Sequence, residues 1–505
     1  MDFIYKKSGT MFNMHSYWTK QPVDVVEHFI KQYSNEQETV LDPFCGTGII
    51  GVAAIRTNRN IILNDISPIC LHISKGYCTN FNVQQDIFKI NKEKIVITKD
   101  LDKYYQTKCS KCGDTAQIKF SIVEEKWENE KYKNKLFKEF SLLKICYKCG
   151  CSKKKQYKIP NYEDLKLFNV GEFKNYFYPK DELIGQEPKR NYKRGIKKVY
   201  QLYSFRNLSV LCKIFNRIMK LSNQDSKQLF LFIFTSILFN SSLMSRYREY
   251  ENTSIKMGTF YIPPLIKDTN VVTNFLNKFN LIIKGNAEIF SRKTNSQVMF
   301  LQESADELKS IKPETIDYIY TDPPYSDIIN YSELNIVFES WLGSKTNIDD
   351  EMIVSSHQKK DIYYYARRFE EFLKKCYIVL KSNKYLTIIF HHPNIEHWKL
   401  IQKAFVNSKF EPILSETPIR LVSKSKTSSQ YKTKKPAQCF LVFNLRKNIM
   451  FGGIKLEILE QNKFEELINK FKKEAIEKGF KQKSDLFDFL INKLIFKYEI
   501  HNFIL

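Results

Sequence analysis

The sequence lacks any hydrophobic run long enough to cross a membrane. Its most apolar stretch, residues 229–239, falls well short of the about 20 residues that a membrane-spanning helix needs, and it predicts a buried helix instead. Residues 1–17 mix charge, glycine and histidine and lack the continuous apolar segment of a secretory signal. We therefore expect a cytoplasmic protein without a membrane partner. The sequence also has no internal repeat and no long low-complexity linker.

Acidic residues are scarce relative to basic ones. The 505 residues include 80 Lys and Arg against 55 Asp and Glu, which gives a formal charge of +25. The excess is largest in residues 101–220, which hold 28 basic and 13 acidic residues. Phosphates bind Lys and Arg with release of counterions, so this segment favours a nucleic-acid partner. A solvated, lysine-rich surface explains the same charge equally well.

The order of predicted elements indicates an interrupted α/β protein. At roughly 100–200 residues per domain, the chain has room for two to four units. Strand and helix patterns alternate in residues 39–78, which predicts the opening of a parallel sheet. The alternation resumes at residue 297 and ends with an apolar strand at residues 438–445. The intervening residues 97–290 predict a separate module with helices at 208–220 and 227–244.

Two short motifs directly follow predicted strands. Asp42-Pro-Phe-Cys-Gly-Thr-Gly48 comes after the first strand, and Thr321-Asp-Pro-Pro-Tyr325 comes after a strand predicted at residues 316–320. A Gly-rich turn lets the backbone approach a ligand and points helix N–H groups at an anionic group. Two consecutive prolines leave a rigid turn at the carboxyl end of a strand, where open α/β sheets bind ligands.

Together the two motifs resemble those of the amino-methyltransferases, which methylate exocyclic amines of bases with S-adenosylmethionine (SAM). The first resembles their SAM-binding motif and the second resembles their catalytic Asp-Pro-Pro-Tyr. The resemblance covers about residues 11–78 and 297–445. It implies a doubly wound, mostly parallel, Rossmann-like SAM-methyltransferase sheet. The middle insert and the tail match only in lying where such proteins carry target-recognition elements.

The resemblance implies a catalytic role for the second motif, Asp322, Pro323, Pro324 and Tyr325. Asp322 and the Pro323 carbonyl would accept hydrogen bonds from the two protons of the target amine, which draws its lone pair towards the methyl group. Tyr325 would stack on an extruded base. Asp at position 322 favours adenine N6 over cytosine N4 in this family. The structural alternative is a turn with a helix-capping Asp.

The resemblance also implies a cofactor site. Its expected residues are His15, Tyr17, Asp42, Phe44, Gly46, Gly48, Asp65 and Asp306. Gly46 and Gly48 would approach the methionyl end of SAM, and Asp65 would accept the ribose hydroxyls. His15 and Tyr17 belong to a segment that closes over the methionine part, although a lone histidine is usually a core or surface residue. Asp306 would read the SAM adenine; a helix N-cap in this segment is the equal alternative.

Other aromatic and basic residues point to the same chemistry. Phe390-His391-His392 resembles the motif whose aromatic ring lies against the flipped base, and Tyr331 and Glu333 either shape that pocket or have core and helix-start roles. Basic residues interleaved with tyrosines could grip phosphates or form a solvated face. They are Lys153, Lys154, Lys155, Lys189, Arg190, Lys193, Arg194, Lys197 and Lys198, with a second set at Lys424, Lys426, Lys432, Lys434 and Lys435.

Cysteines are spaced for a metal. Eleven cysteines, an odd number, argue against a fully paired disulfide framework. The pairs Cys109/Cys112 and Cys146/Cys149 form two CxxC-Gly knuckles, which predict four thiolates around a tetrahedral Zn²⁺. Cys151 is a spare that could replace Cys149. Four thiolates leave no open position, so we expect structural zinc.

The sequence therefore predicts four segments. Residues 1–96 begin a SAM-binding methyltransferase domain, 97–290 form an inserted zinc-ribbon and helical recognition module, 291–447 complete the domain with the catalytic motif, and 448–505 form a helical appendage. We expect a site-specific DNA methyltransferase that acts on N6 of a flipped adenine in double-stranded DNA. Restriction-modification or phage defence is the expected setting, with a cognate endonuclease or defence-system subunit as partner. The alternatives are a cytosine-N4 DNA or guanine-N2 RNA methyltransferase, and a non-catalytic zinc-containing DNA-binding subunit.

Overall fold

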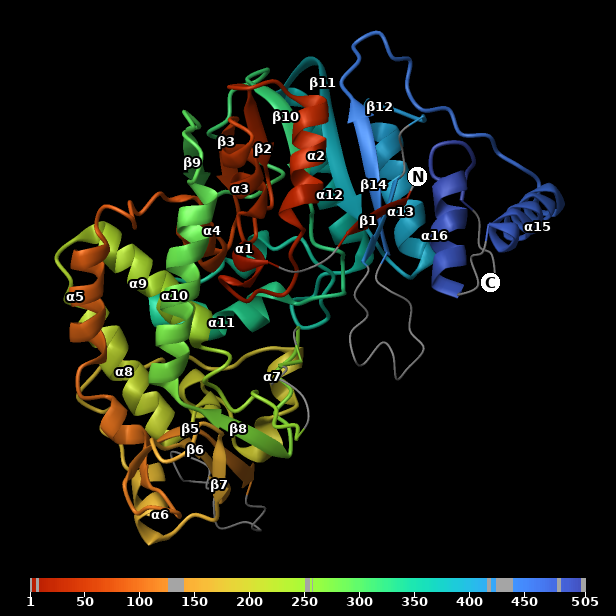
Figure 1. Ribbon diagram of the computed structural model, residues 1–505. Coiled ribbons are helices and arrows are strands. Elements are labelled where there is room, and N and C mark those ends of the chain that lie inside the picture. Colours follow the sequence, from red (N-terminus) through yellow and green to blue (C-terminus); the bar gives the residue numbers. More distant parts are fainter. Residues whose placement is uncertain are drawn as a thin grey trace.

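Two sheets joined by helices make up the protein (Figure 1). The computed structural model describes residues 2–5, 9–125, 140–249, 255–256, 258–415, 419–423, 439–478 and 483–500. The larger sheet has nine strands. They are β1 (Asp2–Tyr5), β2 (Thr39–Asp42), β3 (Asn60–Asn64), β9 (Val298–Leu301), β10 (Ile316–Thr321), β11 (Leu380–Phe390), β12 (Glu411–Pro412), β13 (Ile419–Ser423) and β14 (Cys439–Arg446).

The larger sheet is parallel-rich. The neighbours in the order β9-β3-β2-β10-β11 all run parallel, whereas β14 runs antiparallel to β11 and β13 antiparallel to β14. From β2 the chain moves outward to β3 and β9, and from β10 it moves outward the other way to β11. The strand order therefore reverses between β2 and β10, and ligands bind at such a switch point, outside the carboxyl ends of the strands.

Helices cover both faces of this sheet. Helices α2 (Val23–Tyr33) and α3 (Ile49–Arg56) pack together on one face, and α12 (Ile362–Val379) and α13 (Ile395–Asn407) pack together on the other (Figure 1). Every residue of β10 is buried, as expected for a central parallel strand that is covered on both sides. The expected strand and helix alternation is thus present as a mixed α/β structure.

The second sheet lies within the predicted insert. Its antiparallel strands are β4 (Gln106–Lys108), β5 (Thr115–Glu125), β6 (Phe140–Lys148), β7 (Gln156–Lys158) and β8 (Leu265–Thr269). A buried ion pair joins this sheet to helix α8 (Phe205–Met219), because Arg206 Nη2 lies 2.6 Å from Asp268 Oδ2 in β8. Ser204 Oγ also donates to the Asp268 carboxylate, at 2.7 Å, so the buried charge is well satisfied.

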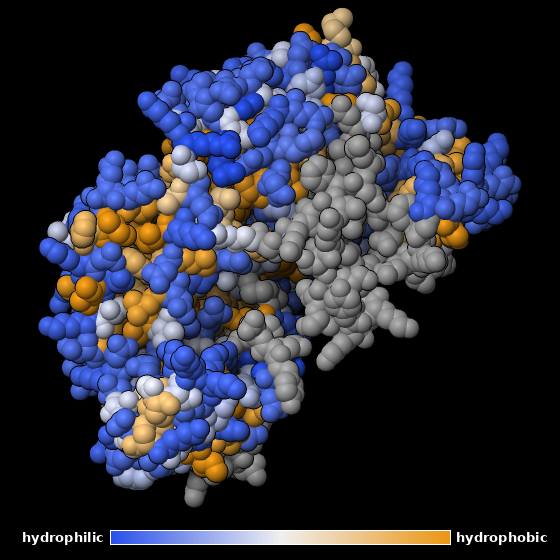
Figure 2. Space-filling view, viewed as in Figure 1, coloured by the Kyte–Doolittle hydropathy of each residue, from blue (hydrophilic) through white to orange (hydrophobic). Residues whose placement is uncertain are grey.

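Helices between β3 and β9 connect the two sheets. They are α5 (Ile87–Thr98), α6 (Tyr162–Phe168), α7 (Gln186–Lys189), α8, α9 (Gln224–Ile237) and α10 (Val271–Ile289). Residues 229–239, the apolar stretch, fall largely within α9 and are mostly buried, which confirms the expected buried helix. Among the described helices, none is long and apolar enough to span a bilayer. On the face shown in Figure 2, hydrophobic residues gather over the α5 side, where Phe88 is 83% exposed.

The C-terminal segment packs against the larger sheet. Helix α15 (Gln461–Glu477) is followed by α16 (Lys483–Leu494), and α16 contacts β14. Gln402 Nε2 in α13 donates to the carbonyls of Ile495 and Tyr498, each at 2.8 Å. These bonds fix the end of the tail beside α13.

Candidate active site

An open cavity lies at the carboxyl ends of the central parallel strands. Residues that follow β2, β3, β9 and β10 all line it, together with the segment before α2 and the helix α11 (Tyr331–Leu342). Both sequence motifs contribute, through Phe44 and Gly46 from the first and Asp322 and Pro324 from the second. The fold therefore brings together two motifs that are separated by more than half of the chain.

The turn of the first motif depends on two glycines. Gly46 has φ +49° and Gly48 has φ +73°, in the left-handed region that favours glycine. A Cβ atom at Gly48 would lie 2.7 Å from Ser74 Cα in helix α4 (Pro68–Cys78), so this backbone also packs too closely for a side chain. Helix α3 begins directly afterwards at Ile49.

Asp65 fixes this turn from the neighbouring strand. Its carboxylate accepts hydrogen bonds from the backbone N–H of Gly46 at 3.0 Å and of Ser67 at 2.9 Å. Burial raises the pKa of Asp65 to about 6. The two N–H donors act in the opposite direction, because they favour the charged form. The carboxylate lines the cavity and retains lone pairs for further donors.

Asp322 carries the acceptor of the second motif. Gln21 Nε2 donates to Asp322 Oδ2 at 2.6 Å, and the Tyr325 hydroxyl donates to Oδ1. The Tyr325 ring is 9% exposed, packs edge-on against Phe390 with centroids 5.5 Å apart, and does not line the cavity. Burial and the Asp322 charge raise the pKa of Tyr325, so its hydroxyl stays a donor. Base stacking by Tyr325 would require this ring to leave its packing position.

The proline turn is held from helix α12. The Tyr365 hydroxyl donates to the Pro324 carbonyl at 2.7 Å. Pro324 lines the cavity, whereas Pro323 does not. Because β10 is fully buried and the turn is anchored at this carbonyl, the Asp322 carboxylate has a fixed place at the strand end.

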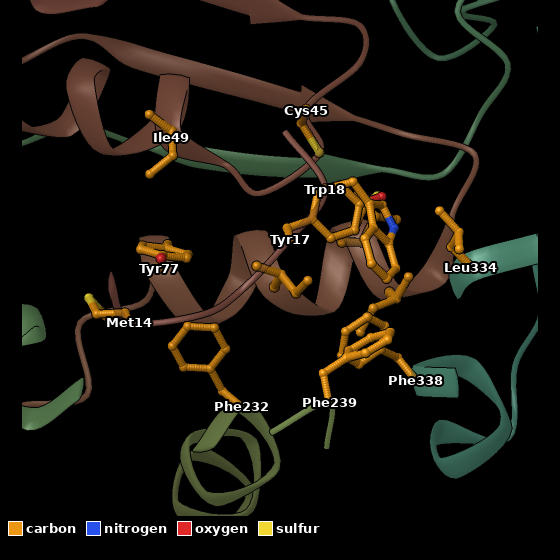
Figure 3. Packing of buried hydrophobic residues seen from close by; sticks show 14 of the residues in the cluster. Met14, Tyr17, Trp18, Cys45, Ile49, Tyr77, Phe232, Phe239, Leu334 and Phe338 are labelled. Atoms are coloured by element: carbon orange, nitrogen blue, oxygen red, sulfur yellow. The ribbon is translucent and has the colours of Figure 1, made fainter. Parts of the chain in front are cut away.

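The segment before α2 forms one wall of the cavity. Tyr17 and Trp18 lie between the Cys45 turn and the side chains of Phe239, Leu334 and Phe338 (Figure 3). Trp18 Nε1 donates to Asn335 Oδ1 at 2.8 Å, and the Tyr17 hydroxyl lies 2.9 Å from Cys70 Sγ. Tyr17 thus lines the cavity as predicted for the cofactor site.

His15, by contrast, does not line the cavity. Its Nε2 lies 3.0 Å from Thr235 Oγ1 in α9, its Nδ1 lies 2.8 Å from the Ser16 carbonyl, and its ring stacks on Phe232. Burial lowers the pKa of His15 well below its usual value, so the ring is neutral. The predicted cofactor contact is replaced by a role in attaching the N-terminal segment to the insert, because α9 supplies a hydroxyl and an aromatic face there.

Two predicted acidic residues also differ from expectation. Asp42 is fully buried behind the turn, outside the cavity lining, and accepts from the Phe44 N–H at 3.2 Å. Asp306 lines the cavity, but its carboxylate is paired with the Arg368 guanidinium, whose Nη2 lies 2.9 Å from Oδ1. Arg368 comes from α12 and carries no local motif, so sequence reasoning missed it.

The charge around the cavity suits a ligand that is mostly cationic. Six acidic side chains line it: Asp65, Glu303, Asp306, Asp322, Asp350 and Glu351. Lys20 is the one cationic residue of the lining within the described part of the chain. Its ammonium donates to the Phe12 carbonyl at 2.8 Å, and burial and nearby Lys278 lower its pKa. SAM combines a sulfonium and an ammonium with one carboxylate, so this donor and acceptor set fits it.

Tyr331 and Glu333 take different positions. Tyr331 lines the cavity, where its hydroxyl lies 3.4 Å from Thr19 Oγ1. Glu333 instead accepts from the Glu187 N–H at 2.9 Å and is 5% exposed, so it anchors α7 to α11. Only Tyr331 of the two is available to a ligand in this cavity.

Four cysteines cluster in the insert, and one of them differs from the predicted ligand set. They are Cys109, Cys112, Cys149 and Cys151. The Sγ atoms of Cys109 and Cys151 are 3.6 Å apart and those of Cys112 and Cys149 are 3.5 Å apart, close to the about 3.8 Å between sulfurs on a tetrahedral Zn²⁺. Backbone N–H groups of Cys112 and Lys111 that point at the Cys109 sulfur lower its pKa to about 6, which favours the ligating thiolate.

Cys146 does not belong to this cluster, so its prediction as a ligand is corrected. It lies inside β6, where neighbouring side chains point to opposite faces. The Tyr147 hydroxyl reaches Ser110 Oγ, beside Cys109, at 2.8 Å, whereas Cys146 is buried on the other face against Phe120 and Ile122. The spare, Cys151, occupies the fourth position instead, and Cys149 is retained.

A second group of potential ligands lies beside the Asp-Pro-Pro-Tyr turn. His392 and His397 stack with ring centroids 3.5 Å apart, and His392 Nε2 lies 2.9 Å from Asp327 Oδ1. However, the Asn394 N–H donates to His392 Nδ1, which assigns the ring proton to Nε2 and leaves no lone pair there for a metal. We therefore interpret His392 and Asp327 as a hydrogen-bonded pair that links the segment after the Asp-Pro-Pro-Tyr turn to the segment between β11 and α13.

One family model matches the N-terminal part of the chain. The sequence model of a family described as DNA methylase matches residues 4–76, which include the first motif and Asp65. No curated protein matches the chain. A methyltransferase homolog from Pyrococcus horikoshii is 14% identical with a TM-score of 0.18, over 35% of this chain and 57% of that one. A Haemonchus contortus phosphoethanolamine N-methyltransferase 2 in complex with SAM is 10% identical with a TM-score of 0.16, over 84% and 98% of the two chains.

Proposed function

We propose that the protein is a SAM-dependent DNA methyltransferase that acts on an exocyclic amine, with N6 of adenine as its target. One observation carries the proposal: Asp322 of the Asp-Pro-Pro-Tyr turn and the glycine turn with Asp65 line a single cavity. The match of residues 4–76 to the DNA methylase family supports the same reaction class. An open α/β sheet places both turns where ligands bind.

In this proposal the cavity binds SAM through residues of the first motif and its neighbours. Asp65 accepts the ribose hydroxyls, and the backbone at Gly46 and Gly48 approaches the methionyl end. Tyr17 forms the wall over the methionine part. SAM, when bound, supplies a methyl group on a positively charged sulfur.

The chemistry then depends on Asp322. Its carboxylate accepts a hydrogen bond from the target amine, which holds the nitrogen lone pair towards the methyl carbon. A C–N bond forms as the S–C bond breaks, the electron pair of the broken bond stays on sulfur, and one amine proton passes through Asp322 to solvent. No covalent intermediate with the protein is needed.

We propose that the insert binds the DNA and that Cys109, Cys112, Cys149 and Cys151 hold a structural Zn²⁺ there. The smaller sheet carries lysines beside aromatic rings: Lys144 Nζ lies 5.2 Å from the Tyr157 ring centroid, and Lys267 Nζ lies 4.7 Å from that of Phe120. Tyr157 is 45% exposed. A cation next to an accessible ring, as Lys144 is next to Tyr157, suits phosphates and bases, whereas the Phe120 ring is buried. The second predicted basic set, Lys424, Lys426, Lys432, Lys434 and Lys435, lies outside the described residues.

A methylation assay with the purified protein tests this proposal. The protein is incubated with methyl-labelled SAM and either unmodified double-stranded DNA or RNA, and the nucleosides are separated by mass spectrometry. We expect N6-methyladenine in DNA. N4-methylcytosine in DNA would instead establish the cytosine alternative, and N2-methylguanine in RNA would establish the RNA alternative. SAM binding without any transfer would favour a binding subunit.

A restriction-modification or defence setting, with a separate nuclease partner, remains part of the proposal. A methyl mark at one short recognition sequence would support it, because such systems protect defined sites. Co-purification of an endonuclease with the tagged protein from its native cell would identify the partner. Methylation of every adenine regardless of sequence would argue against this setting.

A further inference from the structure

We propose that Gln21 is a positioning residue for the transfer reaction: it holds the Asp322 carboxylate in place and presents its amide oxygen to the target amine. This inference rests on the proposed function and deepens it. Neither sequence motif contains Gln21, which lies between Lys20 and Pro22, directly before α2.

The contact that carries the inference joins distant parts of the chain. Gln21 Nε2 donates to Asp322 Oδ2 at 2.6 Å across a separation of 301 positions. Both residues line the cavity, and Gln21 is 7% exposed. A carboxylate only accepts, so the amide nitrogen has to face Asp322, which fixes the orientation of the amide. The amide oxygen therefore points elsewhere.

That oxygen has no partner in the part of the chain that the structure describes. Gln21 Oε1 is buried and forms no hydrogen bond among the described residues. A buried polar atom without a partner is costly, and such atoms usually meet a ligand or water. Because Gln21 lines the cavity beside Asp322, an N–H of the target amine is the partner that the reaction supplies. The amine's two protons would then meet Asp322 and Gln21 Oε1, in place of the Pro323 carbonyl, because Pro323 does not line the cavity.

The amide nitrogen of Gln21 acts on Asp322 itself. Gln21 Nε2 and the Tyr325 hydroxyl each donate to one oxygen of Asp322. With one donor on each oxygen, the plane of the carboxylate is fixed. Gln21 thereby holds the carboxylate correctly oriented before the amine arrives.

The test compares Gln21→Leu and Gln21→Glu with the exposed control Gln85→Leu in the full-length protein. Folding is checked by circular dichroism, affinity for S-adenosylhomocysteine by calorimetry, and kcat for methylation of unmodified DNA between pH 6 and 8.5. We expect Gln21→Leu to lower kcat about tenfold to 100-fold, the range for loss of a hydrogen bond to a charged group, with cofactor affinity within about threefold of the wild type. Gln85→Leu should leave both unchanged.

The glutamate variant separates positioning from a merely structural role. At pH 8.5 its side chain is a second carboxylate that faces Asp322. The kcat of Gln21→Glu at this pH should therefore be as low as that of Gln21→Leu. At pH 6 a shared proton restores a donor, so its kcat relative to the wild type should rise. A Gln21→Leu kcat within twofold of the wild type, or an equal loss of cofactor affinity, would overturn the inference. A wild type that binds cofactor but methylates no nucleic acid would overturn the proposed function itself.

Discussion

Cofactor affinity should weaken as the pH falls through about 6, because Asp65 must be ionised to accept the ribose hydroxyls. Burial raises the pKa of Asp65 to about 6, above its unfolded value of about 3.9. The carboxyl is therefore mostly ionised at pH 7 and mostly protonated at pH 5. With one linked proton, the dissociation constant should rise about tenfold between these pH values.

Calorimetric titration with S-adenosylhomocysteine from pH 5 to 8 measures this dependence, and Asp65→Asn is its control. The variant should bind about tenfold to 100-fold more weakly at pH 7, because it lacks the charged acceptor. It should also lose the change in affinity between pH 7 and pH 5. An Asp65→Asn variant that keeps both the affinity and the pH dependence of the wild type would refute the assignment of Asp65.

Three further changes test other parts of the account. Gly48→Val should abolish cofactor binding, measured by the same titration, because its side chain would meet Ser74 at 2.7 Å and a φ of +73° disfavours it; unchanged binding would contradict the tight turn. Cys151→Ser should lose the zinc that elemental analysis detects, whereas Cys146→Ser should retain it. The opposite result would restore Cys146 as the fourth zinc ligand in place of Cys151.

Sequence patterns predicted the features that depend on local residues. The Gly46 turn, the Asp322 turn and the strands that precede them are each encoded within a few consecutive positions, so spacing alone identified them. Cys109 and Cys112 could be assigned in the same way. The parallel arrangement followed from alternating strands and helices, whose carboxyl ends meet at one edge.

Features that depend on distant partners could not be predicted in this way. Gln21 and Arg368 act on Asp322 and Asp306 from other elements, and no local pattern marks them. Cys146 was assigned as a ligand from its CxxC spacing, but β6 continues through it and turns its side chain to the opposite face. His15 was placed at the cofactor, because the sequence did not reveal that α9 packs beside it.

The most direct test of the central claim is a comparison of DNA from cells that express the wild type or Asp322→Ala. Long-read sequencing of the DNA detects methylated bases, and calorimetry on the two purified proteins checks that the variant still binds S-adenosylhomocysteine. The account predicts N6-methyladenine at a defined sequence with the wild type and none with Asp322→Ala. An identical mark with both proteins, or no mark from a wild type that binds the cofactor, would contradict it.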